Sequence, residues 1–300
     1  MDTPVLLLTF NRLDTVKTLL LRLSEVKPSK LYISSDGPRL GNSKDEIVFE
    51  IREYIKNNVT WECKVNYLFQ NENLGCKTAV SRAITWLFQS EDRGIILEDD
   101  CLPSHSFFIY CETLLNRYST NHRIWLISGY NPYGNWRSKS SGDYLYSRLG
   151  GIWGWATWRR AWINYTDSID DLESLIDQGK FRHLLGDYLG KERGKMLSEG
   201  LRNKNVDSWA YRWALSRHRC GALGCVPRVN LIENIGLNAE ATHTVRTPRR
   251  RPDVFEMNSY EAPEWLIPDA DFDEGYFLAS SRFSRLRIFL RKVYYAFVNF

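Results

Sequence analysis

Short apolar runs alternate with longer amphipathic segments through the first 130 residues, and this alternation constrains the fold more than any other feature of the chain. The runs Val5–Phe10, Leu31–Ser35 and Ile124–Ser128 are mostly apolar, as expected of strands that are buried on both faces. Thr15–Leu23 has the apolar stripe of a helix, and Asp14 is expected to cap it. The repeated strand–helix order predicts an α/β fold, with a mostly parallel sheet flanked by helices.

The same two patterns of apolar residues predict the remaining elements. In the first part we expect helices near Lys44–Lys56, Thr78–Phe88 and Phe107–Leu115 and strands near Val65–Phe69 and Gly94–Leu97. Beyond Tyr130 we expect a polar loop over Asn131–Gly142, a glycine- and tryptophan-rich segment over Gly150–Trp158 that leads into a helix, helices around Leu172–Ile176, Tyr188–Arg202 and Ser208–Ser216, and strands at Tyr144–Arg148 and Val229–Ile232. Residues 240–280 contain several prolines and little periodicity, so they are expected to form a loop or lid.

Composition excludes several classes of protein. With 25% charged and 43% hydrophobic residues, the chain has an ordinary globular composition, which argues against disorder and fibrous repeats. The net charge of +4 is too small to indicate a nucleic-acid-binding protein. The 11 tryptophans could cover sugar rings with their flat apolar faces, although filling a core is the general alternative for each of them.

The sequence also predicts the compartment. No run reaches the ~18 apolar residues that a membrane span needs, and Val5–Phe10 is too short for the core of a signal peptide. The six cysteines form no CxxC pair, and without an export signal we expect them to be reduced thiols. These features predict a cytoplasmic protein.

Residues 281–300 differ from the rest of the chain. They contain four Arg, one Lys and no acid, so the remainder of the chain is about neutral. Five of their apolar residues fall on one helical stripe: Phe283, Leu286, Leu290, Val293 and Phe297. This segment could lie on an anionic membrane, which would place the protein peripherally at the inner face. The alternative is a terminal helix that docks on the core.

Three consecutive acids, Glu98, Asp99 and Asp100, follow the predicted strand Gly94–Leu97. Like charges so close together are costly without a cation, and open α/β sheets bind ligands at the carboxyl ends of their strands. Clustered carboxylates suit Mg²⁺ or Mn²⁺, which in turn hold a diphosphate. The alternative is an acidic loop in water.

Other candidate residues follow the first two predicted strands. Asp36 could accept a hydrogen bond from a nucleobase N–H, or could simply form an Asp-Gly turn. Arg12 could present its guanidinium to phosphate, or could be a solvated side chain at a helix start. Neither GxGxxG nor GxxxxGK[ST] is present, so the dinucleotide and P-loop interpretations lose their main support.

Two candidates come from the later part of the chain. Asp207 precedes a predicted helix, so it could be an N-cap or a general base that faces the acidic cluster. The five histidines show no paired metal-ligand spacing, and only His243 is considered as a metal ligand.

Several segments, in this order, resemble those of the GT-A nucleotide-sugar glycosyltransferases, and among these the inverting N-acetylglucosaminyltransferase I family. The similar segments are Thr9–Val16, Ser34–Gly37, Leu97–Tyr110, Trp125–Asn131, Gly151–Trp158 and Val206–Trp209. Asn71–Lys77 instead resembles the Asn-x-Gly region of bacterial relatives that make surface polysaccharides. The family's acidic WDDW pattern is reduced here to Val-Asp-Ser-Trp, which leaves one Asp.

This resemblance implies roles for the matching residues. Asp100 would coordinate Mn²⁺ or Mg²⁺ at the diphosphate, and Asp207 would take the proton from the acceptor hydroxyl. Asp36 would bind the uracil and Arg12 the phosphates. The residues implied in nucleotide-sugar binding are Phe10, Asn11, Arg12, Asp36, Lys77, Glu98, Asp99, Trp153 and Gly154.

The implied activity is metal-dependent, inverting transfer from a UDP-sugar, with UDP-GlcNAc favoured by the resemblance, to a glycan or lipid-linked saccharide. Residues 1–130 would form the donor half of one GT-A domain and 131–250 its acceptor and catalytic half, followed by an irregular segment and a basic helix over 251–300. Two alternatives stay open. A sugar nucleotidyltransferase would usually carry a Gly-rich loop where Thr9–Asp14 has no glycine; the other is a non-catalytic nucleotide- or glycan-binding protein.

Overall fold

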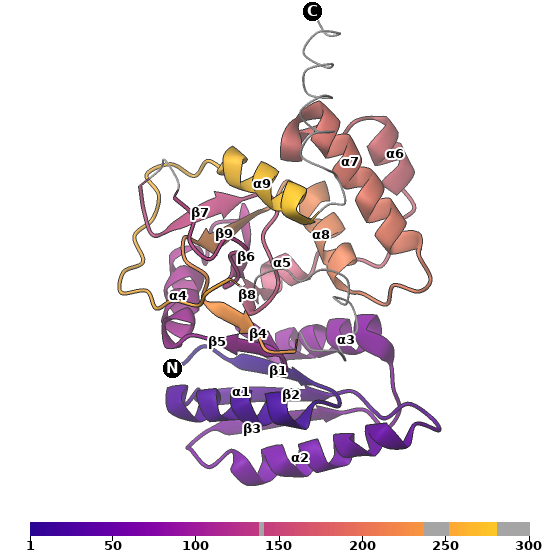
Figure 1. Cartoon of the computed structure of the whole chain (residues 1–300), viewed down its shortest axis with the longest axis vertical. Coiled ribbons are helices and arrows are strands. Elements are labelled where there is room, and N and C mark those ends of the chain that lie inside the picture. The colour runs from indigo at the N-terminus through magenta and orange to yellow at the C-terminus, as the bar shows by residue number, and fades with distance from the viewer. Residues whose placement is uncertain (138–140, 237–251, 281–300) are drawn as a thin grey trace, which may run out of the picture.

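The computed structural model describes residues 1–137, 141–236 and 252–280 (Figure 1). Its strands are β1 (Val5–Thr9), β2 (Lys30–Ser35), β3 (Lys64–Phe69), β4 (Arg93–Glu98), β5 (Cys101–Pro103), β6 (Ile124–Ser128), β7 (Tyr144–Ser147), β8 (Trp155–Trp158), β9 (Leu223–Pro227) and β10 (Ile232–Asn234). Its α-helices are α1 (Leu13–Val26), α2 (Ile47–Asn58), α3 (Gly75–Ser90), α4 (His105–Arg117), α5 (Arg159–Trp162), α6 (Leu172–Asp177), α7 (Arg182–Arg202), α8 (Ala210–Arg219) and α9 (Ala270–Ser280). A 3-10 turn over Ser43–Glu46 precedes α2.

An eight-stranded sheet with the order β3-β2-β1-β4-β8-β6-β9-β7 forms the centre of the molecule. The strands β3, β2, β1 and β4 are parallel to one another. Strand β8 lies antiparallel between β4 and β6, β9 is parallel to β6, and β7 is antiparallel to β9. All strands of this sheet except β7 and β8 therefore point the same way, and the predicted mostly parallel α/β fold is confirmed.

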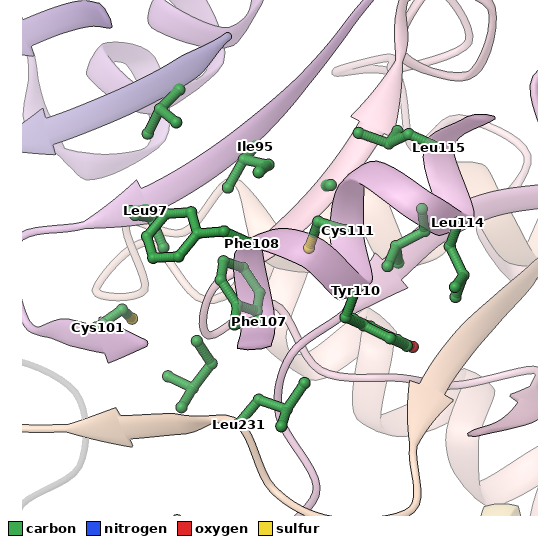
Figure 2. Packing of buried hydrophobic residues seen from close by; sticks show 14 of the residues in the cluster. Ile95, Leu97, Cys101, Phe107, Phe108, Tyr110, Cys111, Leu114, Leu115 and Leu231 are labelled. Atoms are coloured by element: carbon green, nitrogen blue, oxygen red, sulfur yellow. The ribbon is translucent and has the colours of Figure 1, made fainter. Parts of the chain in front are cut away.

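The alternation of side chains along β1 explains the layers. Val5 and Leu7 point to one face of the sheet, where they pack with α1, α2 and α4, whereas Leu6 and Leu8 pack on the other face with α3, α5 and α8. Because both faces are covered, the strand needs the continuous apolar run that the sequence shows. Figure 2 shows how α4 contributes Phe107 and other side chains to the first of these two layers.

Five of the tryptophans fill the second layer, so core packing is confirmed for these side chains. Trp155 stacks on Trp209 with ring centroids 5.5 Å apart, and Trp125 stacks on Trp213 at 6.0 Å. Trp162 touches the same group. Each of the five is at most 7% exposed, which leaves no face for a sugar.

Several predicted elements are wrong in detail. Asp14 does not cap α1, because this helix begins at Leu13 and Arg12 occupies the N-cap position. Residues 155–158, the end of the glycine- and tryptophan-rich segment expected to lead into a helix, form the antiparallel strand β8, for which no strand is predicted, and the expected helix follows as α5. The strand expected at Val229–Ile232 is displaced to β9 and β10 on either side, and the expected loop over 240–280 contains α9.

Some predictions lie outside the described residues, namely those for His243, for the basic segment 281–300 and for part of the loop over 131–142. Within the described ranges, no helix is long and apolar enough to cross a membrane. All six cysteines are free thiols, as the sequence predicted.

Candidate functional site

Three strands bring the predicted site residues to one edge of the sheet. The parallel strands β1, β2 and β4 end at the same edge, where Leu8 pairs in register with Glu98 and Thr9 pairs with Ser35. The loop after each strand carries candidate residues: Phe10 to Arg12 after β1, Asp36 after β2, and Asp99 and Asp100 after β4. This edge is where open α/β sheets bind ligands.

The guanidinium of Arg12 lies between two of the three acids. Its Nη1 is 2.8 Å from Asp100 Oδ2 and 3.4 Å from Asp99 Oδ1. The backbone N–H of Phe10 donates to Asp99 Oδ2 at 3.2 Å, so the loop after β1 is tied to the acidic turn at two points. The three acids are therefore held by the fold, which disfavours a freely solvated acidic loop.

The cluster has more negative charge than its surroundings neutralise. The pKa of Glu98 is raised to about 8. Burial is the largest cause and the charges of Asp100 and Asp99 act in the same direction, whereas Arg12 and a hydrogen bond from Trp209 oppose the rise. Burial and the charge of Asp100 raise the pKa of Asp99 to about 7. One guanidinium faces three carboxyl groups, so an additional cation would stabilise their ionised forms.

These residues fit a divalent cation that is shared with a phosphate group. Carboxylate oxygens are the donors that Mg²⁺ and Mn²⁺ prefer, and Asp100 offers them at the end of β4. Within the described part of the chain, no group of three or more His, Cys, Asp or Glu side chains could hold a metal by itself. Such a group is unnecessary where one or two carboxylates share the ion with substrate phosphates. Gly236, which follows β10, also lies close to Asp100, since a Cβ atom at Gly236 would be 2.6 Å from Asp100 Oδ2.

Asp36 does more than terminate a turn. Its Oδ1 accepts hydrogen bonds from the backbone N–H groups of Gly37 and Leu74, both at 2.9 Å, and its Oδ2 accepts one from Asn73 Nδ2 at 3.0 Å. Burial raises the pKa of this carboxyl, whereas the backbone hydrogen bonds oppose that rise. The backbone N–H of Gly75 also acts on this carboxyl, so the turn that leads into α3 surrounds Asp36 with donors.

Arg52 of α2 holds the backbone of the loop that contains Asp36. Its Nη2 donates to the carbonyl oxygens of Asp36 at 3.1 Å and Gln70 at 2.6 Å. Gly37 is required by close packing, because a Cβ atom there would lie 2.4 Å from the carbonyl carbon of Glu72. The ends of β2 and β3 are thus fixed to the segment that leads into α3.

A second buried acid positions the loop after β1. Asp45 accepts hydrogen bonds from Asn11 Nδ2 at 2.9 Å and Arg39 Nε at 2.6 Å, and the Arg39 guanidinium lies 5.2 Å from the centre of the Phe10 ring. The hydrogen bond from Arg39 is the largest cause that lowers the pKa of Asp45 to about 2. Sequence reasoning missed Asp45 and Arg39, because a lone acid in a polar stretch gives no signal of burial.

Asp207 lies against the first turn of α3. Its Oδ1 accepts a hydrogen bond from the backbone N–H of Lys77 at 3.2 Å, and a Cβ atom at Gly75 would lie 2.4 Å from its Oδ2. The N-terminus of a helix favours a carboxylate because its N–H groups and dipole are positive. Asp207 therefore contacts the start of α3 rather than capping α8, which begins later at Ala210.

The thiol of Cys76 lies within electrostatic range of the candidate acids. The pKa of its thiol is raised to about 12, mainly by burial and in addition by the charges of four carboxylates: Glu98, Asp207, Asp36 and Asp100. The sequence does not indicate that Cys76 lies near these acids, because it is an isolated cysteine. The acids that sequence reasoning singled out from three separate segments are thus close enough to one thiol to act on it electrostatically.

Trp153 and Gly154 lie beside the end of β4. Gly154 has a φ of +56°, and a Cβ atom there would lie 2.3 Å from Ile232 Cδ1 and 3.5 Å from Leu97 Cδ2, so only glycine fits. The carbonyl of Gly154 accepts a hydrogen bond from the N–H of Gly129 at 2.8 Å. The half-buried Trp153 ring packs 4.6 Å from that of Tyr130.

Comparisons with known proteins give only distant similarities. No model of a protein family and no curated protein matches the chain. Among solved structures, it is similar to apo UDP-glucose pyrophosphorylase, with 11% identity, 79% of this chain and 94% of that chain covered, and a TM-score of 0.39. It is also similar to mouse xyloside xylosyltransferase 1, with 11% identity, coverage of 72% and 81%, and a TM-score of 0.35. It is similar as well to HddC from Yersinia pseudotuberculosis, with 14% identity, coverage of 53% of this chain and 77% of that chain, and a TM-score of 0.30. At this level the function has to be inferred from the residues of the site themselves.

Proposed function

We propose that the protein is a metal-dependent, inverting glycosyltransferase that moves a sugar from a UDP-sugar to a hydroxyl group of a glycan or lipid-linked saccharide. The observation that carries this proposal is that Asp36, Glu98 and Asp100 lie at the carboxyl ends of strands that share one edge of the sheet, with Asp207 close enough to act electrostatically on the same thiol, Cys76. Arg12 adds a guanidinium to the same edge of the sheet. A nucleotide diphosphate has matching groups, namely a base with N–H donors and phosphates that bind guanidinium and metal ions.

The donor would lie along the carboxyl ends of β2, β1 and β4. Asp36 would accept the uracil N–H in exchange for one of its present donors, and the Arg12 guanidinium can move from the carboxylates to a phosphate oxygen. Glu98 and Asp99 offer oxygens to the hydroxyl groups of the ribose and the sugar. Trp153 and Gly154 border the same position from the next strand.

Asp100 would hold Mn²⁺ or Mg²⁺ together with the diphosphate. When bound, this ion would neutralise charge on the leaving diphosphate, an electrostatic contribution that is often the largest in such reactions. The backbone of Asp100 is held in place by the Ile235 N–H, which donates to its carbonyl oxygen at 2.8 Å. His243 stays a candidate second ligand.

Asp207 would act as the general base. The Lys77 N–H holds Oδ1, and the absence of a side chain at Gly75 leaves Oδ2 uncovered. Oδ2 would take the proton of the acceptor hydroxyl while that oxygen forms a bond to the anomeric carbon. The bond between this carbon and the diphosphate breaks on the opposite side, which inverts the configuration. General-base assistance of this kind is worth ~10²–10⁴ in rate.

The competing activity is sugar nucleotidyl transfer on the same fold. The loop from Thr9 to Asp14 has no glycine, and Phe10 and Asn11 are instead held by Arg39 and Asp45. A glycine-rich loop allows the backbone to wrap a triphosphate, whereas this loop presents side chains. This difference favours glycosyl transfer.

The stereochemistry of the product tests the proposal. The protein would be incubated with UDP-GlcNAc, UDP-Glc or UDP-Gal, Mn²⁺ and a panel of saccharide acceptors, and the new anomeric proton would be followed by NMR. We expect release of UDP and a β-linkage from an α-linked donor. Formation of a nucleotide sugar from a sugar phosphate and UTP would instead support the nucleotidyltransferase, and binding of UDP without turnover would support a non-catalytic protein.

A further inference from the structure

A buried arginine near the end of α8 has donors that nothing in the described part of the chain satisfies. Arg217 is 2% exposed, and its Nε and Nη2 are both buried without a hydrogen-bond partner among the described residues. These two N–H groups lie on the same edge of the guanidinium. They form the fork that binds two oxygens of a carboxylate or phosphate at once.

The neighbouring charges make this arrangement costly. Arg193 of α7 lies beside Arg217, and its Nη2 is 3.3 Å from Nε2 of His218, which is 1% exposed. Burial and the charge of Arg193 lower the pKa of Arg217 to about 10. Burial holds the pKa of His218 well below its ordinary value, so this ring is neutral, and its Nδ1 has no hydrogen-bond partner within the described ranges.

The nearest acid is already engaged elsewhere. Asp273 of α9 accepts hydrogen bonds from the Ser147 hydroxyl and, at 2.9 Å, from the backbone N–H of Arg148. The Arg148 guanidinium also lies 3.7 Å from it. Asp273 therefore attracts Arg217 only at a distance, and the group of arginines keeps an excess of positive charge.

The Nη2 group of Arg217 lies next to Gly150, in the segment that leads to Trp153 and Gly154 of the candidate site. Cβ atoms at Gly150 and Gly224 would be 3.8 and 3.4 Å from Arg217 Nη2, so two glycines face the fork. Gly150 begins the segment that continues to Trp153 and Gly154. A Cβ atom at Gly151 would lie 3.5 Å from the hydroxyl of Tyr276, which places α9 against the same segment.

We propose that Arg217, with Arg193 beside it, binds an oxyanion, and that this oxyanion is the phosphate or carboxylate group of the acceptor substrate. The assignment to the acceptor rests on the proposed glycosyl transfer, whereas the anion site does not. An oxyanion would satisfy both donors of the fork and neutralise the excess charge. Because the fork is buried, a neighbouring segment such as that around Gly150 would have to move aside to admit the anion. The site would select acceptors that carry a phosphate, as a lipid-linked saccharide does, or an acidic sugar.

The test measures thermal stability and affinity with two anions. The protein, saturated with UDP and Mn²⁺ so that the donor site is filled, would be titrated with inorganic phosphate or glucuronate at constant ionic strength. The variants are Arg217→Gln and Arg193→Gln, and the matched control is Arg182→Gln, which removes an exposed arginine from the same helix as Arg193. We expect at least one anion to raise Tm in the wild type and the control. Its affinity would fall about tenfold or more in Arg217→Gln, the loss expected for one charge-assisted hydrogen bond.

The outcomes distinguish a phosphorylated acceptor from an acidic saccharide, and they distinguish a failure of the anion site from a failure of the proposed donor site. Stabilisation by phosphate alone indicates a phosphorylated acceptor, and stabilisation by glucuronate alone indicates an acidic saccharide. If neither anion acts on the wild type, or if both act equally on Arg217→Gln and the wild type, the anion site is refuted. If Arg217→Gln does not fold, the half-buried Arg193→Gln decides in its place. A failure of UDP to bind contradicts the donor site only, because the dependence on Arg217 is measured with the free anions.

Discussion

The carboxylate of Asp207 accepts a hydrogen bond from the backbone N–H of Lys77, a residue 130 positions earlier in the chain, at 3.2 Å. This contact joins the loop before α8 to the first turn of α3. It also brings the proposed base to the acids that follow β2 and β4, because Cys76 of the same turn lies among them. One carboxylate thus links the two parts of the proposed active site.

Replacing this carboxylate by an amide separates its two roles. In Asp207→Asn the amide oxygen still accepts the Lys77 N–H, but the side chain can no longer take a proton. We expect transfer to fall ~10²–10⁴-fold with UDP affinity unchanged. The control Asp187→Asn changes an exposed acid of α7. Turnover of Asp207→Asn at the wild-type rate would remove the base from the mechanism.

Gly75 is expected to be sensitive for two physical reasons. Its φ is +77°, and a Cβ atom would lie 2.4 Å from Asp207 Oδ2. Gly75→Ala should lower the free energy of unfolding by more than the about 1–2 kcal/mol of the left-handed backbone alone, and should also reduce transfer. Gly221→Ala is the matched control, since its φ is +60° and a Cβ atom there meets nothing within 4 Å. Equal losses of stability in urea unfolding, with activity kept in both variants, would contradict the contact.

Arg12 is expected to compete with the metal for the same carboxylates. Without it, Asp99 and Asp100 lose their nearest cation. Arg12→Gln should therefore be less stable than the wild type in EDTA by about 1–3 kcal/mol. Added Mn²⁺ should stabilise it more than it stabilises the wild type, while UDP affinity falls about tenfold. Arg22→Gln, which removes an arginine of α1 that pairs with Glu25, is the control. A response to Mn²⁺ equal to that of the wild type would show that the metal does not share these carboxylates.

Asp45 is expected to make the unfolding free energy depend on pH, with stability lost at low pH. Its pKa in the folded protein is about 2, below the ~3.9 of an unfolded chain, so its ionised form stabilises the fold. This stability is complete above about pH 4 and is lost as the pH falls toward 2. The difference in unfolding free energy between the wild type and Asp45→Asn should shrink over that range. It should stay constant for Asp92→Asn, whose side chain is 89% exposed. A constant difference for Asp45→Asn would exclude the buried pair with Arg39.

Much of the donor side could be predicted from sequence because its signals are local. The apolar runs of β1, β2 and β4 are continuous, and parallel strands carry the residues that follow them to one edge. Position in the sequence alone therefore predicts that Asp36, Arg12 and Asp100 lie at one edge of the sheet, as the structure has them.

The rest depends on contacts between distant segments. The pairing of β8 between β4 and β6 is fixed by long-range packing of its tryptophans, so a four-residue run after a glycine-rich stretch did not predict it. Asp207 could be read as a helix cap, yet the helix it contacts lies far away in the sequence. Cys76 and the Arg217 fork have no sequence signal, because burial and missing partners are properties of the folded chain.

The most direct test of the central claim is a calorimetric titration of the protein with UDP, in Mn²⁺ and again in EDTA. We predict binding in Mn²⁺ that weakens strongly in EDTA, and that Asp100→Ala removes the difference between the two conditions while Asp92→Ala keeps it. The same UDP affinity in both conditions, or no binding of UDP to the folded protein, would contradict a metal-dependent nucleotide-sugar site at the carboxyl end of β4.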